Sequence, residues 1–289
     1  MFLYAVILAA FAVLLFSQSG SRTLSRAPLP TLNEDLLAIP SVNDTLGCPA
    51  DQYAVHIFSK APLVIYIENF LTTTDRVHLL GVSEDLFQPS TVTHDGTSTQ
   101  VDPSIRLSEV ALLPRDPTIR CIEARARAFQ GWRRNLWIER LRTQRYTPGG
   151  HYSMHFDWST GAGGWGRVSS FMAWAHVSED IQGGGTEFPY LPTVEARSGN
   201  AFWCKFVECD APSSSRPQST DMEDGQQTLE PGSAVEGVIF KPIPGNAVYW
   251  ENFRADGSGK GYQETLHAGL PVKQGTKVGL NIWTWGALE

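Results

Sequence analysis

The 289-residue sequence is 42% hydrophobic and 18% charged, as in an ordinary globular protein, and is long enough for one large domain plus a leader. Its formal net charge of −7 argues against a nucleic-acid partner, because binding to phosphates depends on Lys and Arg side chains. The charge therefore disfavours enzymes that act on nucleic acids, such as dealkylases.

The first segment is apolar without a break from residue 2 to 16, and Ser17 and Ser19 follow it. It is short for a membrane span of about 20 residues and fits the core of a signal peptide, which needs about 7 to 15. We therefore expect residues 1–19 to be a cleaved signal peptide, or an uncleaved signal anchor that attaches the chain to a membrane. Arg22 and Arg26 follow the run and no basic residue precedes it. By the positive-inside tendency, this charge distribution favours an orientation opposite to the one that would bring the rest of the chain into the lumen.

Two further features favour the secretory pathway, either in the lumen of the endoplasmic reticulum or anchored and facing it. Asn43-Asp-Thr is an acceptor pattern for N-glycosylation. The four cysteines can form two disulfides in an oxidising compartment, with Cys204 and Cys209 as the easy local pair, although three pairings are possible. Four buried thiols are the alternative, and the lack of a Cys-x-x-Cys pair disfavours zinc.

Residues 20–61 are rich in Pro, Ser, Thr and Asn with little periodicity, which predicts a stem or a loosely packed lead-in. The domain that follows, residues 62–289, should be α+β and mainly β. Thr74-Asp75 can cap a helix whose apolar residues are Val77, Leu79, Leu80 and Val82. Asp116-Pro117 opens a second helix, with an apolar stripe made of Ile119, Ile122, Ala126 and Phe129.

Strand patterns occupy four stretches of this domain, at residues 63–67, 105–113, 167–177 and 238–250, the last one broken by a turn at 244–246. The glycine-rich segment 161–166 predicts a flexible loop. A polar, acidic and Pro/Ser-rich insertion spans about 191–236, and we expect it to be disordered in part. It is either a surface excursion between two strands or a lid that gates access to a substrate.

The chemistry is concentrated between residues 145 and 158, in the sequence RYTPGGHYSMHFDW. His155 and Asp157 can converge on one ion, because side chains at i and i+2 of a strand project from the same face. A second His, for which His267 is our choice, would complete a two-His, one-carboxylate triad that leaves one face of an octahedral Fe(II) open. The glycines at 149 and 150 disfavour a helical zinc pair of His151 and His155. If His155 and Asp157 are considered without the other segments, the alternative is a surface His beside a solvated Asp.

Three more pieces accompany this stretch. Lys277 stands ten positions after His267, Arg145-Tyr146 precedes the two glycines, and Gly-Gly-Gly-Thr-Glu-Phe-Pro occupies residues 183–189. With these pieces in this order, the chain resembles the prolyl 4-hydroxylase branch of the Fe(II)/2-oxoglutarate dioxygenases from about Val64 to Trp285. The resemblance implies a double-stranded β-helix, or jelly roll, buttressed by N-terminal helices.

The resemblance also implies roles for individual residues. His155, Asp157 and His267 would bind Fe(II), with no catalytic side chain beyond this centre. Lys277 would pair with the far carboxylate of 2-oxoglutarate, and Tyr146 would hydrogen-bond the same group. O2 is then the second cosubstrate and L-ascorbate the reductant. The alternatives are a solvated strand lysine at 277 and a core aromatic at 146.

Other residues of the predicted strands are expected near the substrate. Ser170 can offer its hydroxyl to a cosubstrate carboxylate, and Trp283, Trp174 and Arg167 are expected in the substrate pocket. Related hydroxylases tend to carry Arg, Thr and Tyr-Leu-Asn along the strand where this chain has Arg167, Ser170 and Trp174-Ala-His. The substrate contacts at these positions therefore differ from the family pattern.

The implied reaction is oxidative decarboxylation of 2-oxoglutarate to succinate and CO2, coupled to hydroxylation of an unactivated C–H bond. A proline-containing polypeptide is the first choice of substrate, and a small metabolite or free amino acid is the alternative. The carboxylate of Asp157 favours hydroxylation over halogenation, because halide would need its place on the metal. A non-catalytic binding domain on the same fold is the alternative of another class, and the intact triad and Lys277 count against it.

Overall fold

The computed structural model describes residues 31–40, 46–94, 98–159, 164–191, 202–209 and 237–288. The leader, Asn43, the first part of the stem, half of the predicted loop at 161–166 and most of the polar insertion lie outside the described residues. None of the helices in these ranges combines the length and the apolar character of a membrane span.

The prediction of a mainly-β chain with few helices is confirmed. The described helices are α2 (Thr73–Ser83) and α3 (Pro117–Phe129), with short 3-10 turns η1 (Glu84–Leu86), η2 (Trp203–Lys205) and η3 (Gln263–Thr265).

The larger sheet is antiparallel and runs in the order β1-β2-β15-β11-β18-β9-β7-β3, with β8 also paired to β18. Its strands are β1 (Ala54–Lys60), β2 (Leu63–Glu68), β3 (Gln88–Pro89), β7 (Glu109–Leu112), β8 (Leu136–Ile138), β9 (Arg142–Tyr146), β11 (Trp165–Val177), β15 (Ala247–Glu251) and β18 (Lys277–Ala287).

The smaller sheet is also antiparallel, in the order β14-β13-β16-β10-β6. Its strands are β6 (Arg106–Leu107), β10 (His151–His155), β13 (Thr186–Phe188), β14 (Val238–Phe240) and β16 (His267–Gly269). Two further pairs join β12 (Gln182–Gly183) to β17 (Val272–Gln274), and β4 (Val92–His94) to β5 (Ser98–Gln100).

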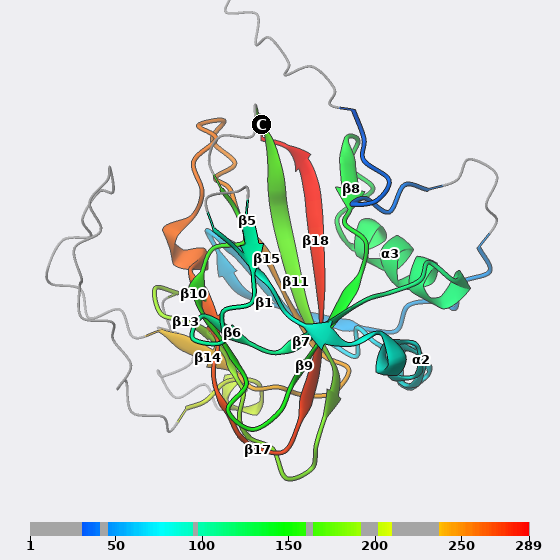
Figure 1. The fold of residues 1–289 in the computed structure, drawn as a ribbon. Coiled ribbons are helices and arrows are strands. Elements are labelled where there is room, and N and C mark those ends of the chain that lie inside the picture. The colour runs from blue at the N-terminus through cyan, green and yellow to red at the C-terminus, as the bar shows by residue number, and fades with distance from the viewer. Residues whose placement is uncertain are drawn as a thin grey trace, which may run out of the picture. The chain divides into compact units, whose positions relative to one another are not determined.

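Helices α2 and α3 lie on one side of the long central strands β11 and β18, and the smaller sheet lies on the other (Figure 1). The helix predicted from Asp116-Pro117 is confirmed: Asp116 caps α3 by accepting a hydrogen bond from the backbone N–H of Ile119 at 3.0 Å. Ile119, Ile122 and other buried residues of its stripe share one hydrophobic core with the sheet. This core fixes the helix side, so the opposite face of the long strands is left to form the site.

The start and the apolar face of α2 differ from expectation. The helix begins at Thr73 and its N-cap is Thr72, whose hydroxyl accepts from the N–H of Asp75 at 3.1 Å. The Asp75 carboxylate accepts from the N–H of Thr72 at 2.9 Å, which completes a capping box. Val77 was wrongly placed in the buried stripe, because it is 67% exposed on the outer side of the helix while Leu79 is fully buried.

The strand predicted at residues 105–113 is two strands in different sheets. β6 belongs to the smaller sheet and β7 to the larger one, and the chain passes between them at Ser108. The carbonyl of Ser108 accepts from the N–H of Ser90 at 2.9 Å, which directs the chain across. The predicted loop at 161–166 was also too long, since β11 already begins at Trp165, which pairs with Ala287.

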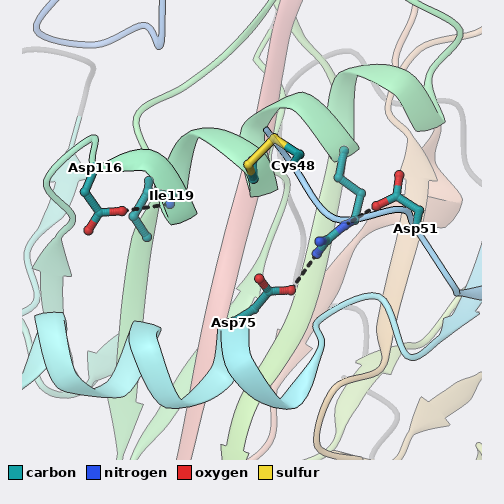
Figure 2. The surroundings of a disulfide bond; sticks show 7 residues. Cys48, Asp51, Asp75, Asp116 and Ile119 are labelled. Carbon is teal, nitrogen blue, oxygen red and sulfur yellow. Dashed lines mark hydrogen bonds and ion pairs between the residues drawn. A yellow bond between two sulfur atoms is a disulfide. The ribbon is translucent and has the colours of Figure 1, made fainter. Parts of the chain in front are cut away.

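The described part of the expected lead-in is packed onto the domain. Cys48 forms a disulfide with Cys121 of α3, 73 residues away. Arg125 of the same helix donates to Asp51 at 2.6 Å and to Asp75 of α2 at 2.8 Å. Figure 2 shows the disulfide and this charge network side by side between the two helices and the chain at residue 51. Cys204 and Cys209 form the second disulfide.

Candidate metal centre

The smaller sheet brings two histidines together. His155 ends β10, His267 begins β16, and the two residues are direct partners in this antiparallel pair. Asp157 follows after the end of β10, so the expectation that one strand carries both His155 and Asp157 is wrong. The pairing is irregular between Tyr152 and His155, and Asp157 approaches the same point from the segment beyond the strand.

The ligand atoms of these three residues lie within 4.8 Å of one another. The Nε2 atom of His155 is 3.8 Å from one carboxylate oxygen of Asp157, and the Nε2 atom of His267 is 3.9 Å from the other. These distances are too long for hydrogen bonds. Two imidazoles and a carboxylate that face each other without bonding are a donor set suited to one divalent cation such as Fe(II).

The backbone orients both imidazole rings. The Nδ1 atom of His155 lies 2.8 Å from the carbonyl oxygen of Ser153, and that of His267 lies 2.9 Å from the carbonyl oxygen of Thr265. An Nδ1–H that donates to a carbonyl leaves the lone pair on Nε2, the atom that faces Asp157. The two rings are therefore held in the tautomer that a metal ligand needs.

The charges in this cluster also suit a metal. Burial, with His267 nearby, lowers the pKa of His155 and keeps its imidazole neutral. Burial by itself would raise the pKa of Asp157, but its neighbours His267, His155 and Arg167 outweigh burial and lower that pKa. Neutral imidazoles and an ionised carboxylate are the protonation states that metal ligation requires.

Ser170 contacts Asp157 of this cluster rather than open space. Its buried hydroxyl hydrogen-bonds the Asp157 side chain and accepts from the amide nitrogen of Asn252 at 3.1 Å. The same nitrogen also donates to the carbonyl of Arg167 at 3.0 Å. Asn252 was missed in the sequence, where the only signal was its place directly after the apolar strand β15. A contact of Ser170 with the cosubstrate stays a prediction.

Lys277 is buried, so the alternative of a solvated strand lysine is wrong. It begins β18 opposite Tyr146 of β9, and it is 1% exposed. Its ammonium lies 4.7 Å from the centre of the Tyr146 ring and donates to the carbonyl of Gly184. Burial lowers the pKa of Lys277 to about 7. No carboxylate pairs with it within the described ranges, so its charge lacks a counter-ion.

Three more predicted residues lie on β11 and β18. The guanidinium of Arg167 forms a two-fold contact with Glu139, at 2.7 and 3.0 Å, and lies 3.9 Å above the ring of Trp283. Trp283 is the partner of Ser170 across the two strands. Trp174 is fully buried and packs near Tyr66 in a second hydrophobic core. The role of these residues in substrate binding stays a prediction.

Tyr152 and Arg106 are two residues at the site that sequence reasoning missed. The Tyr152 ring stacks on His155 with 3.7 Å between ring centres, and the Arg106 guanidinium lies 4.6 Å from the Tyr152 ring centre. Tyr152 and Arg106 are partners in the pairing of β10 with β6. No local pattern could reveal this pairing, because Tyr152 and Arg106 are 46 positions apart in the sequence (152 − 106) and other strands and a helix lie between them.

Comparisons with known proteins agree with this arrangement. A family model described as the 2OG-Fe(II) oxygenase superfamily matches residues 141–285. Prolyl 4-hydroxylase subunit alpha-3 of Mus musculus is 26% identical over 246 residues, which are 81% of this chain but 35% of the relative. Prolyl 4-hydroxylase 5 of Arabidopsis thaliana is 25% identical over 245 residues, 79% of this chain and 70% of the relative.

The fold is also similar to that of a solved structure. It is the viral collagen prolyl hydroxylase vCPH from Paramecium Bursaria Chlorella virus-1 in its 2OG complex, with a TM-score of 0.51 and 22% identity. The match covers 78% of this chain and 96% of that one. The chain spans about a third of the mammalian relative's length, so similarity extends only to that part of the mammalian subunit.

Proposed function

The chain belongs to the 2OG-Fe(II) oxygenase superfamily, and from this premise we propose that it is a 2-oxoglutarate-dependent dioxygenase that hydroxylates an unactivated C–H bond. The observation that carries the proposal is the cluster of His155, Asp157 and His267, whose ligand atoms face one another without hydrogen bonds. We also infer that the larger and smaller sheets are the two sides of a double-stranded β-helix, with the cluster between them.

The three residues of the cluster would hold the iron. Bound iron, with 2-oxoglutarate and O2, supplies the oxidising chemistry that yields succinate, CO2 and a hydroxylated product. This chain's part is to orient the ligands and exclude water. The carbonyls of Ser153 and Thr265 fix the imidazoles, and Ser170 with Asn252 fixes the carboxylate.

Lys277 would bind the far carboxylate of 2-oxoglutarate. A buried ammonium with a carbonyl as its hydrogen-bond acceptor is unfavourable unless an anion joins it. The carboxylate of a cosubstrate satisfies this need, and Tyr146 lies next to the same position. L-Ascorbate is the expected reductant of the iron.

A proline-containing polypeptide is the proposed substrate. Support comes from the relatives, which are named prolyl 4-hydroxylases and match about four-fifths of this chain. Their low identity leaves the side chains that contact the substrate free to differ.

We place the protein in the secretory pathway, in or facing the lumen of the endoplasmic reticulum. All four cysteines are paired, in Cys48–Cys121 and Cys204–Cys209, and such disulfides persist in oxidising compartments. The proposals of an N-terminal signal or anchor and of a glycan on Asn43 rest on the sequence patterns.

Anaerobic binding of Fe(II) and 2-oxoglutarate to the purified chain, followed by succinate release in air with proline-rich peptides, tests the proposal. We expect peptide-stimulated succinate and peptides heavier by one oxygen atom per turnover in mass spectra. His155→Ala should abolish both. His151→Ala is the matched control, because His151 lies on the same strand and its ring hydrogen-bonds, within the described part of the chain, the backbone carbonyls of Gly149 and Ser104.

The other outcomes separate the alternatives. Iron binding with succinate release that no peptide stimulates would redirect the search to small metabolites. No binding of Fe(II) or 2-oxoglutarate by the wild-type chain would contradict the dioxygenase and leave a binding domain.

A further inference from the structure

Three arginines gather beside the metal ligands, although the chain as a whole carries a net charge of −7. We call Arg106 of β6, Arg142 of β9 and Arg167 of β11 the arginine rim. Arg106 lies above Tyr152, which stacks on His155, and the charge of Arg167 acts on Asp157. The rim therefore borders the metal centre.

The negative charge near the arginine rim is too small to balance the positive charge of its three arginines. Glu139 is the carboxylate that acts on Arg142, and both of its oxygens already contact Arg167. Arg142 is half-buried and forms no side-chain hydrogen bond or ion pair within the part of the chain that the structure describes. Its other electrostatic neighbours are the arginines at 106, 140 and 167. A half-buried guanidinium among like charges is unfavourable unless an anion joins it.

The far carboxylate of 2-oxoglutarate is not that anion. Arg142 and Tyr146 lie on the same face of β9, where their partners on β18 are Asn281 and Lys277. Four residues along a strand place the Cα atoms of Arg142 and Tyr146 about 13 Å apart, so a carboxylate held between Lys277 and Tyr146 lies at the other end of β9 from Arg142. The cosubstrate held at Lys277 therefore leaves the Arg142 end of the strand to another molecule.

A wall of tryptophans adjoins the arginine rim. Trp283 lies under Arg167, and its indole N–H is buried without a hydrogen-bond partner in the described chain. Trp285, two residues on and on the same face of β18, stacks on Trp165 at 5.4 Å and lies 6.3 Å from Trp137. Flat apolar surface beside arginine side chains, of which that of Arg142 has no partner in the described chain, suits a molecule that combines an apolar ring or chain with a carboxylate.

We propose that the arginine rim and the tryptophan wall form a substrate subsite that binds a carboxylate next to the group that is hydroxylated, with Arg142 as its specificity-determining residue. The proposal rests on the proposed function and adds a substrate class: acidic substrates, above all polypeptides with Asp or Glu beside the target proline. Guanidinium groups bind carboxylates through two parallel hydrogen bonds, which gives both affinity and orientation.

The test uses proline-rich peptides of equal length that carry Glu or Gln before each proline, all with amidated C-termini. Binding to the full chain with Fe(II) and 2-oxoglutarate, without oxygen, is followed by quenching of tryptophan fluorescence, and succinate release is measured in air. We expect the Glu peptide to bind at least about tenfold more tightly than the Gln peptide, as for a charge-assisted hydrogen bond. In Arg142→Gln the two peptides should bind about equally, and Arg142→Lys should restore part of the difference.

Arg145→Gln is the matched control. Arg145 lies on the same strand but on the opposite face, where it pairs with Glu109 at 2.7 Å and Glu84 at 2.9 Å. This variant should keep the wild-type preference for Glu. A third peptide, with Gln and a free C-terminal carboxylate, separates the sources of the carboxylate: tighter binding than its amidated form assigns the subsite to a terminal acid.

Equal binding of all three peptides to the wild type would overturn the proposal, and so would a preference for Glu that survives in Arg142→Gln. The proposed function fails separately, because a chain without dioxygenase activity would release no succinate in any arm while the fluorescence titration still reports on the subsite.

Discussion

The helix side and the metal side of the domain both bury charged groups, but close ion pairs join these groups on the helix side and not within the metal centre. Between α2 and α3, Arg125 contacts two carboxylates, Asp51 and Asp75, at 2.6 and 2.8 Å, and also the carbonyl of Phe70. At the metal side, Asp157 is 3.8 and 3.9 Å from the two histidines. The charged groups of the first region are hydrogen-bonded to counter-ions, whereas the Asp157 carboxylate of the second is too far from either histidine for a hydrogen bond.

This difference separates a structural role from a functional one. A buried ion pair with all its hydrogen bonds made fixes the helices and needs nothing further. Buried groups held in place by the backbone, but not bonded to each other, make room for a ligand at the expense of stability. Lys277 belongs to the second kind, and the half-buried Arg142, which forms no side-chain hydrogen bond in the described chain, is likewise left without a counter-ion.

Removing the central carboxylate should have the largest effect. Asp157→Ala deletes one of three metal ligands, and we expect Fe(II) affinity to fall by more than about 100-fold, beyond the loss that follows when only an outer hydrogen bond to a ligand is removed. Anaerobic titration with Fe(II) measures this. The free energy of unfolding should fall as well, because the neighbours of Asp157 favour its ionised form in the folded chain, so Fe(II) affinity is compared per folded molecule. Metal affinity equal to the wild type would show that the cluster is not the iron site.

Breaking the complete network should act on stability instead. Arg125→Met removes the cation that pairs with Asp51 and with the buried Asp75. We expect the free energy of unfolding to fall by about 3–5 kcal/mol. Urea unfolding measures it, with Arg127→Met on the same helix as control, since Arg127 makes no ion pair among the described residues. Fe(II) affinity per folded molecule should stay unchanged. A loss of affinity without a loss of stability would remove the distinction between the two regions.

Lys277 gives a smaller and more specific effect. Lys277→Met deletes one charge-assisted hydrogen bond to the cosubstrate, and we expect 2-oxoglutarate to bind about 10-fold to 100-fold more weakly, or about 1.5–3 kcal/mol. Anaerobic titration with 2-oxoglutarate measures this, and the Fe(II) affinity of the same variant is the internal control.

The same variant tests the burial of the charge. Because burial lowers the folded pKa of Lys277 to about 7, the unfolded chain binds more protons than the folded one between pH 7 and the ordinary lysine pKa of about 10.4. The penalty is therefore full below pH 7 and fades as pH rises through this window. Lys277→Met should raise the free energy of unfolding more at pH 6 than at pH 9.5. An equal change at both pH values would mean that the lysine is solvated.

Much of the local structure could be predicted from the sequence, because it depends on neighbours along the chain. The cap and stripe of α3 follow from Asp116-Pro117 and the helical period, and the long strand β11 follows from its apolar run. The α2 cap was placed two residues too late, because three threonines in a row can serve as a cap, and Thr72 is the one whose spacing from Asp75 allows a capping box.

The sequence predicted which residues make up the candidate site, but not how they are arranged in space. His155, Asp157, His267 and Lys277 stand out by residue type and spacing alone. Only the tertiary structure decides that Asp157 leaves its strand, that Lys277 is buried with no carboxylate partner among the described residues, and that Arg106, Arg142 and Arg167 lie close to one another. The physical reason is that residue spacing encodes periodicity and caps, whereas burial and charge pairing depend on sheet register, which joins strands far apart in the sequence.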